Sequence, residues 1–286
     1  EEMRDTLARD AVACLNVDAS TSGDRLAMSA TPSLRPFLYE AARAVADPRG
    51  RGSVYDVWRA GTGANIRGYG VAAGAKTDEP PVSILGSGSD YTVFFNHIGI
   101  PSVDMLFDRP YGVYHSAYDS HEWMKRQGDP GFAYHAAMAR LWGVMALRLA
   151  NADAMPFDFS MYGRDLLAYI DDLAAVAKAK SVPLDLGPAR AQAERLAALA
   201  APAPDARGAA EALCLAERDF LAPEGLPGRP WFRHLVYAPL PSYAAETLPG
   251  VREAVVAGDA AGAAQQAAVL AAAIGRAADR LSAPRP

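Results

Sequence analysis

Two segments place polar side chains directly after predicted strands. Residues 11–18 form an apolar run that suits a buried strand, and Asp18 ends that run. Its carboxylate would stand at the carboxyl edge of a sheet, where open α/β proteins bind ligands. Residues 86–90 (Gly-Ser-Gly-Ser-Asp) join another predicted strand to a helix, so backbone N–H groups of this loop would face such a ligand. The alternative to ligand binding is that each of these polar residues serves only as a turn former or a helix cap.

A third segment, the aromatic loop 111–120, contains His115 between Tyr114 and Asp119. A neutral imidazole that a nearby acid orients is a frequent metal ligand, so this loop is a candidate metal-binding segment. A lone histidine is more often structural. We expect packing or surface roles for three of the other histidines: His97, His121 and His135. The sequence leaves the role of His234 open.

Two common catalytic patterns are missing from the sequence. The glycines between 68 and 74 have neither the spacing nor the leading strand of a dinucleotide-binding fingerprint. The serines of 86–90 do not fit the Gly-x-Ser-x-Gly turn that exposes the nucleophile of a serine hydrolase. The formal net charge of −5 disfavours nucleic acid as a partner, because nucleic-acid binders have a basic excess or a basic stripe. Two cysteines, Cys14 and Cys214, are too few for a disulfide framework or a thiolate zinc cluster.

An α/β fold is predicted for the first half of the chain. We expect strands at 11–18, 25–30, 82–85 and 101–107. We expect helices at 1–10, 32–46, 90–98 and 129–150. The order strand, helix, strand favours a parallel or mixed sheet with flanking helices. Residues 48–81 are rich in Gly, Pro and Arg and show no sustained period, so they are predicted to form a long surface excursion.

After Pro156 the sequence predicts only helices. Hydrophobic residues make up 51% of the 286 residues and charged residues 21%, which is an ordinary globular composition. Apolar stripes at helical spacing predict four helices, near 166–176, 196–199, 209–220 and 260–281. We therefore divide the chain into an α/β domain at 1–156 and a helical domain at 157–286. Asp259 and two glutamines interrupt the alanine-rich stretch 254–273, and no segment has the apolar length of a membrane span.

Much of the chain resembles the C-terminal half of the glutamate carboxypeptidase II family. The resemblance is carried by three stretches: VSILGSGSDYTVFFNHIGIPSVDM (82–105), YHSAYDS (114–120) and LPGRPWFRHLVYAP (226–239). This family comprises exopeptidases with two zinc ions, together with the non-enzymatic transferrin receptor. It implies the C-terminal part of a zinc-peptidase α/β domain, followed by a transferrin receptor-like dimerisation domain and hence a homodimer.

The resemblance implies two metal ligands in this chain. Asp18 is similar to an aspartate that ligates one zinc ion, and His115 is similar to the histidine that ligates the other. The family's remaining ligands and its general-base glutamate precede this region, and Glu1 and Glu2 are not in register with them. Catalytic zinc needs about three protein ligands and an open position. We therefore expect that the parent protein hydrolyses peptides with a zinc-activated water, whereas the isolated chain binds zinc weakly and is inactive.

The resemblance also implies residues that contact a peptide substrate. Tyr114 resembles a tyrosine whose hydroxyl reaches the tetrahedral intermediate, which is an oxyanion-type role. Gly88 and Ser89 match a loop that contacts substrate beside the metal ions. Tyr243 resembles a tyrosine that extends from the helical domain into the substrate pocket. Asp119 is expected to orient the metal-ligating imidazole.

Two departures from the family pattern affect the expected substrate. Ser242 replaces a lysine, and residues 102–107 lack the arginines that favour acidic substrates, so we expect no strong preference for poly-acidic peptides. The alternative is a receptor-like homologue without catalysis, whose helical domain serves only dimerisation. The resemblance further implies an extracytoplasmic parent protein, either secreted, periplasmic or membrane-anchored.

Overall fold

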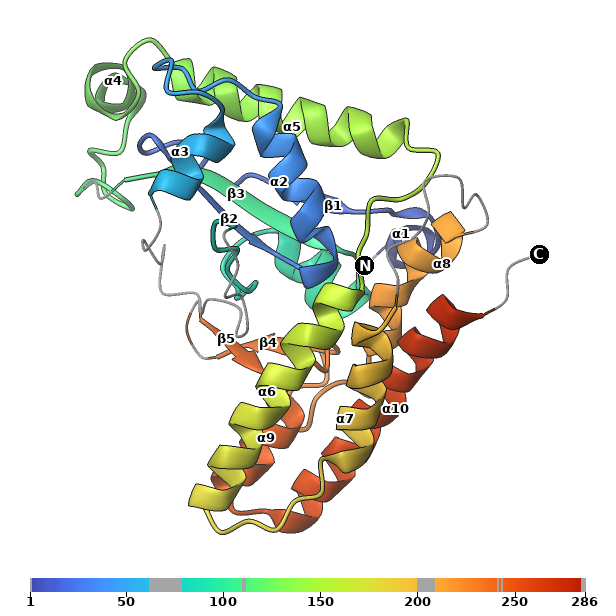
Figure 1. The fold of residues 1–286 in the computed structure, drawn as a ribbon. Helices are drawn as coiled ribbons and strands as arrows, with labels where there is room; N and C mark the ends of the chain where they lie inside the picture. Colours follow the sequence, from blue (N-terminus) through green and yellow to red (C-terminus); the bar gives the residue numbers. More distant parts are fainter. Residues whose placement is uncertain are drawn as a thin grey trace.

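A mixed sheet of three strands lies at the centre of the N-terminal part (Figure 1). The computed structural model describes residues 2–61, 79–109, 112–199, 209–240, 242 and 244–283. The spatial order of the strands is β1 (Cys14–Asn16), β3 (Ser102–Asp108) and β2 (Arg25–Ala30). β1 runs parallel to β3, and β2 runs antiparallel to it. The mixed sheet agrees with the prediction, although β1 is shorter than the apolar run that predicted it.

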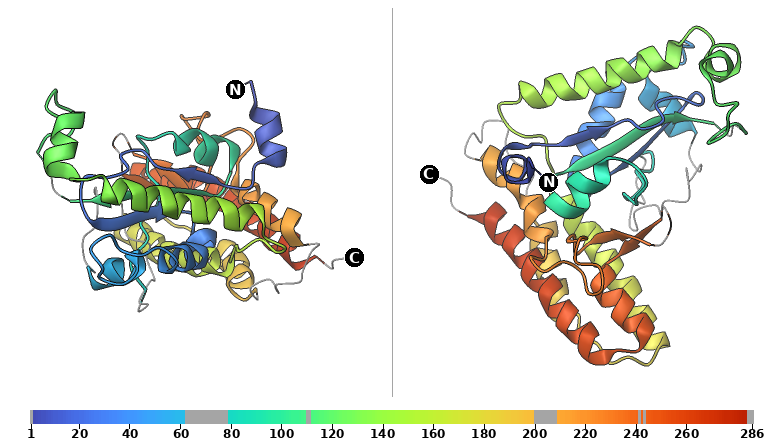
Figure 2. Two further views of the ribbon diagram at one scale, coloured as in Figure 1. Left: turned by 90° about the horizontal axis from the view of Figure 1, so that it is seen from above. Right: turned by 180° about the vertical axis from the view of Figure 1, so that it is seen from behind.

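Helical segments cover both faces of this sheet (Figure 2). On one side lie α2 (Arg35–Arg43) and α3 (Val54–Ala60), and on the other lies the π-helical segment η3 (Val93–Ile98). The long helix α5 (Ala133–Ala150) contacts both α2 and β3. Because both faces are covered, six of the seven residues of β3 are buried.

The predicted strand at 82–85 is wrong. Ser83 forms only an isolated bridge with Ser29 of β2, through the N–H of Ser83 and the N–H of Ala30. The apolar residues Val82, Ile84 and Leu85 are buried against the core, so their pattern indicates burial and not strand pairing. The following helix is confirmed, and Gly99 ends it with φ 73°, a conformation that favours glycine.

The prediction of a long surface excursion over 48–81 is also wrong in part. Within it, α3 buries Val54, Tyr55 and Trp58 against α2 and β2. Ser53 and Asp56 begin this helix with a reciprocal capping box, in which each side chain accepts a hydrogen bond from the other's N–H. Residues 62–78 lie outside the described part of the chain.

The C-terminal part is mainly a bundle of helices, whose long axes are roughly aligned in Figure 1. Its helices are α6 (Ser160–Ala179), α7 (Gly187–Ala197), α8 (Ala209–Ala216), α9 (Pro249–Ala257) and α10 (Ala260–Ser282). A hairpin of β4 (Tyr237–Pro239) and β5 (Ala245–Thr247) lies beside them. The hairpin and α9 were not predicted, whereas the other four helices were.

Short helical segments complete the described elements. They are α1 (Arg4–Asp10), η1 (Pro32–Leu34), α4 (His121–Trp123), η4 (Met124–Gly128) and η5 (Glu217–Phe220). The buried side chains form one continuous cluster that extends from the sheet into the helical bundle. Among the residues that the structure describes, no helix combines the length and the apolar character needed to cross a membrane.

Candidate functional site

Asn16 joins three segments that are far apart in the sequence. Its Nδ2 atom lies 2.7 Å from Oγ of Ser89, in the loop 86–90, and 2.8 Å from Oδ1 of Asp104, on β3. Asn16 and Asp104 are paired residues of the parallel strands β1 and β3. The hydrogen bonds therefore hold the glycine-serine loop against the face of the sheet that carries Asp104. This role of Asn16 was not predicted from the sequence.

Asp18 lies two residues beyond Asn16, where the chain has left β1 and bends. Its side chain is exposed, and no hydrogen bond or ion pair to it is found among the described residues. The position at the carboxyl end of β1 is the one that the sequence predicted. An exposed carboxylate at that edge is accessible to a cation or to solvent.

Tyr114 and His115 lie in the loop that follows β3. Their rings stack with centroids 3.9 Å apart and planes inclined by 17°. His115 has φ 57°, which is uncommon for a residue other than glycine, and a turn closed by the Ser116 N–H to the Val113 carbonyl surrounds it. Both side chains are exposed, Tyr114 by 43%. The imidazole is therefore accessible at the surface and is stacked on the phenol ring.

β1 and β3 are parallel, so the chain leaves both strands at the same edge of the sheet. Asp18 follows β1 there, and the loop with His115 follows β3. This topology agrees with a common site, but no contact between the Asp18 and His115 side chains occurs among the described interactions. Their close approach stays a prediction.

The loop 86–90 also contacts the hairpin of the C-terminal part. Ser87 Oγ donates to the carbonyl of Ser242 at 3.1 Å, in the turn between β4 and β5. Gly88 is exposed and has φ 91°, a backbone conformation that favours glycine. Tyr243 lies outside the described residues, so its predicted role is not tested.

His234, whose role the sequence left open, is fully buried in a polar cluster. Its Nδ1 accepts hydrogen bonds from the N–H groups of Val236 and Tyr237, both at 3.2 Å. Its Nε2 therefore carries the proton and donates to Oε1 of Glu217 at 3.0 Å. Tyr162 donates to the same oxygen at 2.5 Å. This histidine supports the packing between α6, η5 and the segment before β4.

The other three histidines have the packing or surface roles that were predicted. His97 lies 2.8 Å from the Trp231 carbonyl, and His135 lies 2.8 Å from Oδ2 of Asp129. His121 is exposed and stacks on Phe132 with centroids 5.6 Å apart. The carboxylate of Asp119 is exposed, and its expected role in orienting His115 is not tested by these contacts.

Cys14, on β1, is not a nucleophile at neutral pH. Burial raises the pKa of its thiol to about 11, and the nearby carboxylates of Asp104 and Asp90 add to that rise. A hydrogen bond with Ser102 acts in the opposite direction but does not cancel these effects. The thiol therefore stays protonated in the physiological range, and cysteine chemistry is not expected at this edge of the sheet.

The donor atoms at this edge fit zinc in kind but not in number. Carboxylate oxygen and imidazole nitrogen, as in Asp18 and His115, are common zinc ligands. Within the described residues, however, no three His, Cys, Asp or Glu side chains form a group that could hold a metal ion. The described part of the chain therefore does not form a complete zinc site.

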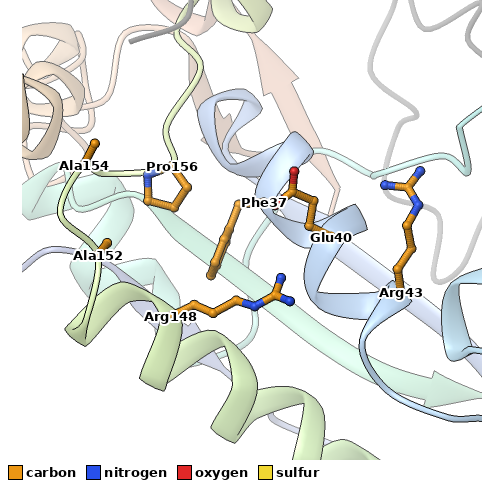
Figure 3. Close-up of a pocket in the computed structure, with 7 residues that line it drawn as sticks. All are labelled: Phe37, Glu40, Arg43, Arg148, Ala152, Ala154 and Pro156. Carbon is orange, nitrogen blue, oxygen red and sulfur yellow. The ribbon is translucent and has the colours of Figure 1, made fainter. Parts of the chain in front are cut away.

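A separate cavity of about 410 Å³ lies between α2 and the segment after α5 (Figure 3). Phe37 lines it together with three charged side chains, Glu40, Arg43 and Arg148. Arg43 binds Glu79 at 2.9 Å and covers the ring of Tyr55, so it belongs to a structural cluster. None of the side chains predicted to act in catalysis lines this cavity.

Comparison with known proteins relates most of the chain to one group of peptidases. Residues 193–282 match the transferrin receptor-like dimerisation domain. Over 89% of its length, the chain is 35% identical to the probable glutamate carboxypeptidase LAMP1 of Arabidopsis thaliana, of which it covers 37%. It is 34% identical over 91% of its length to a probable glutamate carboxypeptidase of Arthroderma benhamiae, of which it covers 37%. It is 30% identical over 89% of its length to aminopeptidase NAALADL1 of Rattus norvegicus, of which it covers 36%.

These matches confirm the resemblance that was predicted from the sequence. The dimerisation-domain match falls on the helical bundle, from the last residues of α7 to the end of α10. The chain spans little more than a third of the length of the relatives that it matches.

Proposed function

We propose that this chain forms the C-terminal part of a zinc-dependent peptidase related to the glutamate carboxypeptidases. The division at 1–156 and 157–286 then separates the end of the peptidase domain from the dimerisation domain. The observation that carries this proposal is the cluster at the carboxyl edge of the sheet. There Asn16 connects the strand before Asp18 with Ser89 of the glycine-serine loop. Sequence identity of about one third with named peptidases supports it.

In this proposal, Asp18 and His115 each bind one of two zinc ions. The exposed carboxylate and the exposed imidazole are ligands of the right chemistry. When bound, such ions lower the pKa of a water molecule and polarise the scissile carbonyl. The remaining ligands and the general base would come from residues outside this chain. The isolated chain is therefore expected to lack peptidase activity.

The chain's other contribution is contact with the peptide. Tyr114, stacked on His115, would donate its phenol hydrogen to the oxygen that becomes negative during hydrolysis. Gly88 and Ser89 would lie against the peptide, and Tyr243 would complete the pocket from the hairpin turn. Its neighbour Ser242 already accepts a hydrogen bond from Ser87 of the glycine-serine loop, which supports this arrangement.

The proposed substrates are peptides without a strong acidic character. Asn16 binds both Ser89 and the carboxylate of Asp104 on β3, and no arginine occurs between 102 and 107. A negative charge at this position disfavours an acidic side chain by repulsion. Comparing kcat/KM for a neutral and a glutamate-terminated dipeptide checks this, and a clear preference for glutamate would contradict it.

Zinc content and peptidase activity of the full-length protein test the main proposal. We expect two zinc ions per chain, and about one after Asp18→Asn or after His115→Ala. Loss of a residue that only supports a metal ligand lowers activity by roughly 10- to 100-fold. Loss of Asp18 or His115, which are proposed as ligands themselves, should lower the rate of hydrolysis by more than that. His121→Ala is the matched control, because His121 is exposed and lies in a neighbouring segment.

Full zinc content in both site variants would contradict the proposed zinc site.

A receptor-like homologue is the second candidate, favoured by the match of 193–282 to the transferrin receptor-like domain. That candidate predicts a homodimer, formed through the helical part, without zinc or hydrolysis. Zinc content and hydrolysis of the same preparations decide between the two, since a protein that sediments as a dimer but is zinc-free and inactive would support the receptor-like function.

A further inference from the structure

The chemistry of Asp104 identifies which atom of Asn16 donates. One atom of the Asn16 amide lies 2.8 Å from Oδ1 of Asp104, and an ionised carboxylate only accepts hydrogen bonds. That atom is therefore the amide nitrogen. If the amide were turned over, two oxygen atoms without a hydrogen between them would face each other.

The direction of the second hydrogen bond follows from the first. The same nitrogen lies 2.7 Å from Ser89 Oγ. An amide nitrogen donates two hydrogen bonds and accepts no hydrogen bond. Ser89 Oγ is therefore the acceptor. Its own hydroxyl hydrogen points away from Asn16, and no second partner of Ser89 Oγ is found in the described ranges. Because Ser89 is only partly buried, this hydrogen can reach a ligand outside the loop.

We propose that the Asn16–Asp104 pair makes Ser89 a hydrogen-bond donor to the substrate. The group that it binds is an accepting oxygen, namely a carbonyl oxygen of the peptide. This inference rests on the proposed peptidase function, whose site it refines. Asp104 acts through Asn16, and Asn16 acts through Ser89, so both are positioning residues for the Ser89 hydroxyl.

Exchanging the two positioning residues separates this role from a purely structural one. In the double variant N16D/D104N, the amide at position 104 donates to the carboxylate at position 16, so their hydrogen bond and the net charge are kept. The carboxylate at position 16 then accepts from the hydroxyl of Ser89. The hydroxyl hydrogen of Ser89 then points to position 16, so Ser89 no longer donates a hydrogen bond to the substrate.

The full-length protein is assayed with the neutral dipeptide Ala-Leu. We expect KM to rise by about 3- to 10-fold in N16D/D104N, the range for one hydrogen bond. The effect should appear in KM and not in kcat, because binding is lost equally in the ground and transition states. Ser89→Ala should give the same change, and adding it to the double variant should give no further change.

Two results would overturn the inference. One is a wild-type KM in N16D/D104N together with a raised KM in Ser89→Ala, which would make the pair only structural. The other is a wild-type KM in Ser89→Ala. If the double variant does not fold, Ser89→Thr replaces it. This variant keeps the hydroxyl, so its KM should lie closer to the wild-type value than that of Ser89→Ala, whereas a rise equal to that of Ser89→Ala would contradict the inference.

Calorimetric binding of Ala-Leu to the EDTA-treated protein separates this inference from the proposed function. Weaker binding in the double variant supports the donor role even if the protein hydrolyses nothing, and then only the proposed peptidase function fails. A wild-type protein that neither binds nor hydrolyses the dipeptide overturns both. Thermal melting of each variant confirms that the fold is kept.

Discussion

Arg35 and Asp165 form a buried ion pair that connects helix α2 of the N-terminal part with helix α6 of the bundle. Arg35 donates from both terminal nitrogens to the two carboxylate oxygens, and Nη1 of Arg35 lies 2.9 Å from Oδ1 of Asp165. The side chains are 7% and 3% exposed. Tyr169 also lies 3.5 Å from the carboxylate. The two parts of the chain are therefore joined by a desolvated charge pair as well as by the continuous apolar core.

Asp165→Ala is expected to destabilise the protein by about 3–5 kcal/mol, because the Arg35 guanidinium would stay buried without its counter-charge. Asp171→Ala is the matched control on the same helix. Asp171 pairs with Arg190, but its side chain is 67% exposed, so its loss should cost less than about 1 kcal/mol. Urea unfolding of both variants measures the difference. Equal shifts of the midpoint would contradict a stabilising role for the buried pair.

The close packing of α6 on α7 depends on Gly163. A Cβ atom at this position would overlap the backbone of Ala197 and lie 2.8 Å from the Ala193 carbonyl. Gly163→Ala should therefore cost about 1–3 kcal/mol, despite the better helix propensity of alanine. Gly143, in the middle of α5, has no atom within 4 Å of such a Cβ. Gly143→Ala should instead stabilise by about 0.5–1 kcal/mol. Thermal melting of both variants checks the opposite signs.

Much of the fold could be predicted because its signals are local. The strand 25–30 was predicted with the bounds that the structure has, and Gly99 was predicted as the end of a helix. The hairpin around Tyr237 was missed because each of its strands has only three residues, which is too short for a periodic pattern. Helix α3 was missed because Gly, Pro and Arg dominate the surrounding residues.

The candidate site could be predicted only in part, for a related physical reason. Asp18 follows β1 at the edge of the sheet, as the order of elements predicted, but the strand expected before the glycine-serine loop is only an isolated bridge. The bridge from Asn16 to Ser89 spans 73 residues, and that from Asn16 to Asp104 spans 88. Such contacts depend on strand register, which no local pattern specifies. The register of β1 on β3 is what pairs Asn16 with Asp104.

Two histidines of this chain should differ in how much their mutation lowers the stability of the fold. His234 is fully buried and donates to Glu217, so His234→Ala should destabilise by about 3 kcal/mol or more through a lost hydrogen bond and a cavity. His115 is exposed, so His115→Ala should change the free energy of unfolding by no more than about 0.5 kcal/mol. Urea unfolding of EDTA-treated protein measures both. A large loss of stability in His115→Ala would indicate a structural role for this loop.

Cys14 should react slowly with iodoacetamide in the folded protein. Its pKa is raised from about 9 to about 11, so at pH 8 the thiolate fraction is about 100-fold lower than for an unperturbed thiol. In the Cys214→Ser variant, which leaves Cys14 as the single cysteine, the alkylation rate should rise about tenfold per pH unit up to about pH 11. A rate that levels off near pH 9 would show that burial does not raise the pKa.

The same shift makes stability depend on pH. A thiol whose pKa is higher in the folded state than in the unfolded state favours folding while it is protonated. This contribution is complete below about pH 8.5, the pKa expected for the unfolded chain, and is lost as pH rises through 9 towards 11. Cys14→Ser removes the titrating group, so its urea midpoint should fall less between pH 8 and pH 11 than that of the wild type. Parallel curves for the two proteins over this range would contradict the coupling.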